Sequence, residues 1–268
     1  MKTTHLLLAT AGTLAASLGA VAQNTTPTNK PAPAQQPEEP KVKATTPELH
    51  EGTQKRHERF NEISKEGKAK LVFVGDSITE AWEGPGRDTW NSRYANRNAA
   101  NFGISGDRTE HVLWRLDNGN FDGLSPDLVV IMIGTNNTGH REDKAEETAA
   151  GIKAIIGRIT KKCPKTKVLL LGIFPRGETV DHPQRKLNVA INEIIKGYAD
   201  NTQVFYKDVG KAFFNDKGEL TKDIMPDYLH LTPEGYKRWA DAIEEDIAKL
   251  LGETKDKSPN PDPTAKPK

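Results

Sequence analysis

The sequence is nearly free of cysteine: Cys163 is the only one among its 268 residues. A single thiol cannot form an intramolecular disulfide, so a fold stapled by disulfides within the chain is excluded. Cys163 precedes Pro164 at the expected end of a helix. We therefore interpret it as a structural residue and not as a nucleophile.

A surplus of either charge is also missing. The chain carries 38 Lys and Arg against 37 Asp and Glu, which leaves a formal net charge of +1. Proteins that bind nucleic acid neutralise phosphates with a basic face, so we expect no nucleic-acid partner. No run of glycines ends in Lys-Ser or Lys-Thr, so a phosphate-binding loop of that type is not expected either.

Apolar runs long enough to cross a bilayer are absent from the sequence as well. The run from Leu6 to about Leu18 is rich in Ala, Gly, Ser and Thr and is too short to span about 30 Å of hydrocarbon reliably. It follows Lys2 and precedes Ala20-Val21-Ala22, which together form the pattern of a signal peptide with its cleavage site. We expect residues 1–22 to be removed on export, giving a secreted or periplasmic protein without an integral membrane span.

Two further segments have compositions that cannot support a packed core. Residues 23–46 are rich in Pro, Thr, Gln, Ala and Lys, and residues 253–268 contain four prolines. Such segments bury too little apolar surface to offset the entropy of ordering. We expect a disordered Pro-rich linker at 23–46, a disordered tail at 253–268, and one folded domain at 47–252.

Within the domain, short apolar runs alternate with helical patterns. The run from Leu128 to Ile133 is apolar on both faces, which is typical of a parallel sheet covered by helices on both sides. The alternation predicts a three-layer α/β domain with a five-stranded parallel sheet. The strands are expected at 71–74, 98–102, 128–133, 168–171 and 204–206, and the helices at 108–118, 143–161, 184–199 and 233–251.

Polar segments follow three of the predicted strands and precede the last helix. In an open parallel sheet these segments meet at the edge formed by the carboxyl ends of the strands. Each has an ordinary structural interpretation when taken alone: a helix cap, a βα turn, an Asn turn or a surface histidine. The four segments are 75–79, 101–108, 134–137 and 227–230.

Taken together, the segments supply every group that a serine nucleophile needs. Ser77 stands at a helix entry, and Asp227 can hold one ring nitrogen of His230 while the other nitrogen reaches the nucleophile. The two glycines after the second strand, Gly103 and Gly106, leave backbone N–H groups unobstructed, and the amide of Asn136 is a neutral donor for an oxyanion. The remaining histidines named here lack such a companion acid, and no role is expected for them: His50, His57, His111, His140 and His182.

The four segments resemble, in order, the four blocks of the SGNH (GDSL-like) hydrolases. The first block is Gly75-Asp76-Ser77-Ile78, the second contributes Gly106, the third Asn136, and the fourth Asp227-x-x-His230. This resemblance implies a three-layer, flavodoxin-like α/β fold and a serine esterase.

The resemblance extends beyond these blocks. The segment from Asn101 to Leu116 (NFGISGDRTEHVLWRL), the segment from Gly134 to Asn137 and Pro175-Arg176-Gly177-Glu178 are similar to the catalytic α subunits of intracellular platelet-activating-factor acetylhydrolase. The similarity covers roughly residues 50–250. Because the related acetylhydrolase subunits form dimers, the resemblance also implies a homodimer.

By resemblance, Ser77 attacks the ester carbonyl, His230 accepts its proton and Asp227 orients His230. The implied oxyanion donors are the backbone N–H groups of Ser77 and Gly106 and the side-chain amide of Asn136. No metal or organic cofactor is required by this mechanism.

The expected substrate is a small ester with a short acyl group, most simply acetyl. Ile78 and Leu229 adjoin the nucleophile and the base, and we expect these bulky side chains to wall the acyl pocket. The export signal and the Pro-rich segments depart from the cytosolic relatives, so an O-acetylated carbohydrate stands beside a phospholipid resembling platelet-activating factor. Trp82, Trp90 and Trp114 are candidates for a sugar platform or for core positions.

Two other functions remain open at this stage. An acyltransferase would use the same acyl-enzyme and pass the acyl group to a sugar. A non-catalytic module would use the same cleft to bind a glycan, although no member of the triad is missing.

Overall fold

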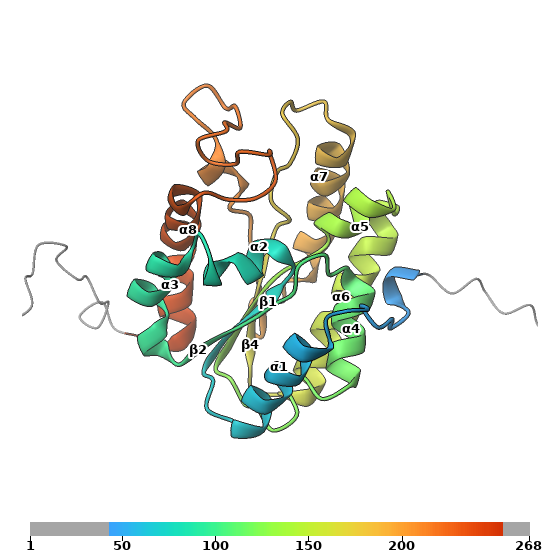
Figure 1. The fold of residues 1–268 in the computed structure, drawn as a ribbon, viewed down its shortest axis with the longest axis vertical. Helices are drawn as coiled ribbons and strands as arrows, with labels where there is room; N and C mark the ends of the chain where they lie inside the picture. The colour runs from blue at the N-terminus through green and yellow to red at the C-terminus, as the bar shows by residue number, and fades with distance from the viewer. Residues whose placement is uncertain (1–42, 254–268) are drawn as a thin grey trace, which may run out of the picture. The chain divides into compact units, whose positions relative to one another are not determined.

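The computed structural model describes residues 43–253, which form a three-layer α/β fold (Figure 1). The central sheet is entirely parallel, with strand order β2-β1-β3-β4-β5. This is the flavodoxin-like order, and it confirms the predicted fold class. The strands are β1 (Leu71–Gly75), β2 (Ala99–Gly103), β3 (Leu128–Met132), β4 (Lys167–Leu171) and β5 (Val204–Lys207).

Alternating side chains of each strand enter two separate cores, because successive residues of a strand point to opposite faces. Val72 and Val74 of β1 face one core, whereas Leu71 and Phe73 face the other. Figure 1 shows α1, α4, α6 and α7 over the first face, and α3 and α8 over the second. The helices are α1 (Gln54–Glu66), α2 (Ser77–Glu80), α3 (Arg87–Arg93), α4 (Thr109–Asp117), α5 (Thr135–His140), α6 (Ala145–Lys162), α7 (Pro183–Ile195) and α8 (Pro233–Leu251).

Helix α8 follows its sequence signals at both ends. The hydroxyl of Thr232 accepts a hydrogen bond from the Gly235 N–H at 3.3 Å, and Pro233 occupies the first turn. Gly252 ends the helix with a left-handed φ of 72°. Helix α7 is shorter than predicted: it ends at Ile195, and residues 196–198 continue as a 3-10 turn.

Helices α1, α3 and α5 lie where the sequence pattern predicted none. Helix α1 fully buries only one large apolar residue, Phe60, α3 fully buries none of its residues, and the buried residues of α5 are all polar. Their apolar periodicity is therefore too weak to be read from the sequence. Phe60 stacks on Phe102 of β2 with ring centres 4.5 Å apart, which fixes α1 against the sheet.

The described fold begins before the expected boundary at residue 47. A 3-10 turn spans Lys43–Thr45, and Ala44 within it is buried. The Ala44 carbonyl accepts a hydrogen bond from the Thr109 hydroxyl at 2.8 Å, which joins this turn to α4. The predicted signal peptide, the rest of the linker and the tail from residue 254 lie outside the described residues. Among residues 43–253, no helix is long and apolar enough to cross a membrane.

The strand order creates a topological switch point between β1 and β3. The chain moves from β1 outward to β2 and then crosses back to β3, on the other side of β1. Crevices for ligands form beyond the carboxyl ends of the strands at such points. Ser77 follows β1 and Asn136 follows β3, so the fold brings both to this crevice.

Candidate active site

The turn after β1 presents Ser77 and can be made only with a glycine at position 75. A Cβ at Gly75 would lie 2.1 Å from Thr79 Oγ1 and 2.4 Å from the Met132 carbonyl oxygen. Asp76 then caps α2, since its Oδ1 accepts a hydrogen bond from the Ile78 N–H at 3.0 Å. Ser77 is therefore the first residue of α2 and remains half-buried at the crevice.

The loop before α8 holds Asp227 and His230 in a compact turn. His230 Nδ1 lies 2.6 Å from Asp227 Oδ2, while Asp227 Oδ1 accepts hydrogen bonds from the backbone N–H groups of Leu229 at 3.0 Å and His230 at 2.8 Å. Tyr228 between them adopts a left-handed φ of 57°, which folds both side chains to the same side. Partial burial alone would raise the pKa of Asp227, but these hydrogen bonds outweigh it and hold the pKa below its usual value.

The two segments meet in a continuous chain of hydrogen bonds. Ser77 Oγ lies 3.0 Å from His230 Nε2, although the two residues are 153 positions apart. The structure thus brings together the predicted nucleophile, base and acid in the geometry that a serine triad requires.

Besides Ser77, the predicted oxyanion donors come from two segments: Gly106 lies in residues 104–108, the oxyanion loop after β2, and Asn136 lies in α5. Gly106 has a φ of 80°, a conformation that favours glycine, and within residues 43–253 its N–H has no hydrogen-bond acceptor. Asn136 is 5% exposed, and its Nδ2 donates one hydrogen to the Asp107 carbonyl at 2.9 Å. Among residues 43–253, no acceptor takes the second hydrogen of the Asn136 amide, so it can be donated to a ligand. The Ile104 N–H donates to the Gly75 carbonyl at 3.2 Å, which fixes the loop beside the nucleophile turn.

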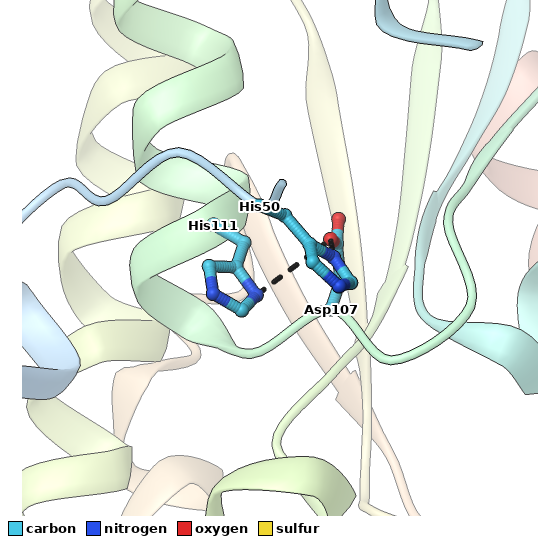
Figure 2. Close-up of side chains that lie close together, drawn as sticks. All are labelled: His50, Asp107 and His111. Atoms are coloured by element: carbon cyan, nitrogen blue, oxygen red, sulfur yellow. Dashed lines mark hydrogen bonds and ion pairs between the residues drawn. The ribbon is translucent and has the colours of Figure 1, made fainter. Parts of the chain in front are cut away.

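A largely buried network of His50, Asp107, His111 and Arg115 supports the oxyanion loop. No role was expected from the sequence for its two histidines. Figure 2 shows His50 and His111 lying together at the Asp107 carboxylate. His50 Nδ1 lies 2.8 Å from Asp107 Oδ1, and Arg115 Nε donates to Asp107 Oδ2 at 2.9 Å. The His50 and His111 rings stack at 4.4 Å. A Cβ at Gly106 would lie 3.1 Å from His50 Cε1, so the ring covers the oxyanion loop directly.

His50, Asp107 and His111 also form a set of side chains that could hold a cation, with ligand atoms all within 4.8 Å of one another. Asp107 and His111 already have protein partners, however. Asp107 is paired with the Arg115 guanidinium, and His111 Nδ1 accepts the Arg108 N–H at 3.1 Å. Burial lowers the pKa of His111 to about 4, so this ring is neutral at ordinary pH. We interpret the cluster as structural support for the oxyanion loop.

Asp76 holds an unusual carboxyl group directly beside the nucleophile. It is fully buried, and its Oδ2 has no hydrogen-bond partner among residues 43–253. This burial raises the pKa of Asp76 to about 7, against the lowering effect of the hydrogen bond from Ile78. No sequence signal separates such a buried cap from an ordinary exposed one.

The residues expected to shape the substrate pocket have different environments. Ile78 is 1% exposed and packs in the second core, and its carbonyl accepts the Tyr236 hydroxyl at 2.7 Å. Leu229 packs against the same core but keeps some exposed surface. Their role in an acyl pocket stays a prediction. Trp82 is a buried core residue and cannot serve as a sugar platform, whereas Trp90 and Trp114 are half-buried.

Comparison with known proteins gives consistent matches. A sequence model of the GDSL-like Lipase/Acylhydrolase family matches residues 73–238. Platelet-activating factor acetylhydrolase IB subunit alpha1 of Bos taurus is 35% identical over 211 residues, covering 78% of this chain and 88% of that protein. Subunit alpha2 of Homo sapiens is 37% identical over 200 residues, covering 74% and 85%.

Solved structures share the fold at lower sequence identity. A GDSL-like lipase from Bacteroides thetaiotaomicron superposes with a TM-score of 0.58 at 23% identity, covering 72% of this chain and 97% of that one. The acetylxylan esterase Axe2 from Geobacillus stearothermophilus gives a TM-score of 0.55 at 21% identity, covering 69% and 95%.

Proposed function

The chain belongs to the GDSL-like lipase/acylhydrolase family and is a carboxylic ester hydrolase, and we propose that it cleaves short-chain esters through Ser77, His230 and Asp227. The observation that carries this proposal is the unbroken path from Ser77 Oγ to His230 Nε2 at 3.0 Å and from His230 Nδ1 to Asp227 Oδ2 at 2.6 Å.

The proposed reaction has two steps. Ser77 Oγ attacks the ester carbonyl while His230 accepts its proton, and the resulting oxyanion is bound by the N–H groups of Ser77 and Gly106 and by the Asn136 amide. His230 then returns the proton to the departing alcohol, which leaves an acyl-Ser77 ester. In the second step His230 takes a proton from water as the water oxygen attacks the acyl carbonyl. His230 then returns this proton to Ser77 Oγ as the bond from Oγ to the acyl carbon breaks, which releases the carboxylic acid and restores both residues.

Hydrolysis is favoured over the two alternatives. The His230 side chain is 45% exposed, so water can reach the base that activates it against the acyl-enzyme. A transferase has to keep water away from this intermediate. A glycan-binding module has no need for a serine hydrogen-bonded to a histidine and an aspartate.

For the substrate we propose an acetyl ester. Leu229 adjoins the base and keeps some exposed surface, so its bulky side chain favours a short acyl group, whereas Ile78 is buried in the second core. The relatives act, by their names, on platelet-activating factor and on acetylxylan. A phospholipid of the first kind and an O-acetylated carbohydrate are therefore the two candidate substrates.

We further propose that the protein is exported and that it forms a homodimer. Export rests on Lys2, the apolar run and Ala20-Val21-Ala22. Mass spectrometry of the protein from the cell exterior or periplasm would detect an N-terminus at Gln23. Analytical ultracentrifugation tests the dimer.

The first experiment measures hydrolysis of p-nitrophenyl esters of increasing acyl length by the full chain. We expect acetate to be cleaved best and Ser77→Ala to lose about a million-fold in kcat. Ser92→Ala is the matched control, because Ser92 is exposed and bonds only to the Thr89 carbonyl. Equal activity of Ser77→Ala and the wild type would rule out this mechanism.

A further inference from the structure

A cavity of about 470 Å³ lies beside the loop that carries Asp227 and His230. Its walls come from the loop after β4, from α7, from the segment 218–221, and from Tyr228. The Gly177 N–H donates to the Tyr228 carbonyl at 2.9 Å, so the loop after β4 is joined directly to the acid–base loop. In Figure 1 the gold loop after β4 and the orange segment before α8 both extend beyond the same end of the sheet.

Arg185 of α7 lines this cavity and has no anionic partner. The residue is 5% exposed, and its guanidinium carbon lies 4.8 Å from the centre of the Phe214 ring. Within the described part of the chain, its side chain makes no hydrogen bond or ion pair. Burial lowers the pKa of Arg185, with no neighbouring carboxylate to oppose the effect. The unpaired guanidinium nitrogens are not fully buried, so their donors can reach a ligand in the cavity.

Two carboxylates line the same cavity, and each already accepts one hydrogen bond from a neighbouring side chain. Glu178 accepts the Tyr228 hydroxyl at 3.0 Å, and Glu219 accepts a hydrogen bond from the Asn215 amide at 3.0 Å. With one guanidinium and two carboxylates, the cavity carries a formal excess of negative charge. The Lys222 ammonium lies 5.6 Å from the centre of the Tyr228 ring and offsets this excess, so the surroundings of the cavity are close to neutral and fit a neutral ligand.

Hydroxyl groups fit this lining better than an anion does. Each hydroxyl can accept a hydrogen bond from a guanidinium and donate one to a carboxylate. Thr179 and Thr221 add further hydroxyls to the walls, and the Tyr228 ring adds an apolar surface. This combination of donors, acceptors and an aromatic ring matches a sugar.

We propose that this cavity binds the alcohol part of the substrate as a carbohydrate, with Arg185 donating to its oxygens and Glu178 and Glu219 accepting from its hydroxyls. The inference rests on the proposed function, because His230 would protonate the departing alcohol and Tyr228 stands two residues before His230. It assigns Arg185 as a residue that selects sugar esters over simple esters.

The test compares kcat/KM for an acetylated xylo-oligosaccharide and for p-nitrophenyl acetate. Arg185→Met keeps the length of the side chain and its packing on Phe214 but removes the donors. A hydrogen bond to a charged group predicts a loss of about 10- to 100-fold on the sugar ester, with little change on p-nitrophenyl acetate. The matched control is Arg158→Met, because Arg158 pairs with Asp117 and lines no part of this cavity. It should leave both activities unchanged.

Other outcomes overturn the inference separately from the proposed function. Equal losses on both esters, or a lowered melting temperature that accounts for them, would make Arg185 a packing residue. A loss confined to a 2-acetyl glycerophosphocholine would assign the cavity to a phospholipid instead.

If the wild type cleaves no ester at all, the proposed function fails, and calorimetry still tests the cavity. Xylotriose should bind the Ser77→Ala protein at least 10-fold more tightly than the Ser77→Ala, Arg185→Met protein. Equal affinities would remove the carbohydrate site.

Discussion

The site contains two aspartate–histidine pairs that look alike in distance and differ in surroundings. His230 Nδ1 lies 2.6 Å from Asp227, and His50 Nδ1 lies 2.8 Å from Asp107. The Asp227 side chain is 54% exposed, whereas that of Asp107 is completely buried. The first pair leaves His230 Nε2 free to face Ser77, while the second is cross-linked by Arg115 beneath the oxyanion loop.

This difference separates two tasks that a hydrolase has to combine. The acid–base pair exchanges protons with water and alcohol, so it has to remain accessible. The oxyanion donors have to be fixed before charge develops, and a buried network fixes them without reorganisation during the reaction. We therefore expect mutations in the first pair to affect rate far more than stability, and mutations in the second pair to affect stability strongly.

The largest expected effect tests the exposed pair. Asp227→Asn keeps the shape of the side chain but favours the wrong tautomer of His230, and in a serine triad this change lowers kcat by about 10,000-fold. The free energy of unfolding at pH 7 should change by less than about 1 kcal/mol, because a hydrogen-bonded pair that is this exposed contributes little to stability. Steady-state kinetics and urea unfolding measure the two quantities. A large loss of stability together with a small loss of rate would reverse the assignment of the two pairs.

The second prediction tests the buried pair. Asp107→Ala removes the partner of Arg115, whose side chain is 3% exposed, and leaves an uncompensated buried charge. The free energy of unfolding should fall by about 3 to 5 kcal/mol, as measured by urea denaturation. Asp117→Ala is the control, because it breaks the exposed pair with Arg158 and should cost less than about 1 kcal/mol. Similar losses in the two variants would show that the buried network contributes no special support.

The third prediction concerns the donor that joins the network to the reaction. Asn136→Ala removes the amide that donates to the Asp107 carbonyl and is proposed to bind the oxyanion. The value of kcat should fall about 100- to 1000-fold with KM little changed, since the contact strengthens in the transition state. Asn118→Ala serves as the control, because the Asn118 amide bonds to the Trp114 carbonyl at the surface. A rise in KM at constant kcat would assign Asn136 to substrate binding instead.

The fold was readable from the sequence where apolar periodicity is strong. The five predicted strands and the helices α4, α6, α7 and α8 are confirmed, because their buried faces consist of clear apolar runs. Helix α1 was missed because Phe60 is its only fully buried large apolar residue, α3 because none of its residues is fully buried, and α5 because its buried residues are polar.

The triad residues could be found because each stands in a short local motif, and the structure brings these motifs together. The supporting residues have no such motif. His50 lies 57 positions from Asp107, and only the folded chain reveals the contact between them. Arg185 sits in an amphipathic helix, where an arginine ordinarily lies on the solvated face. Burial and the absence of an ionic partner are properties of the folded chain that no single-sequence pattern carries.

The smallest expected effect concerns Asp76, which is buried like Asp107 but has no cationic partner within hydrogen-bonding distance among residues 43–253. Its pKa is raised to about 7 in the folded state, so the folded protein binds this proton more tightly than the unfolded chain does. The contribution of Asp76 to stability is therefore fully present below about pH 4 and is lost as pH rises toward 7, by at most about 1.4 kcal/mol per pH unit.

In Asp76→Asn the Oδ1 acceptor for the Ile78 N–H is kept and the titration is removed. Urea unfolding at pH 5 and pH 6 should show the stability of Asp76→Asn relative to wild type increasing by about 1.4 kcal/mol. A constant difference between the two proteins across this range would mean that Asp76 remains ionised in the fold, and the contrast between the paired and unpaired buried carboxyl groups would disappear.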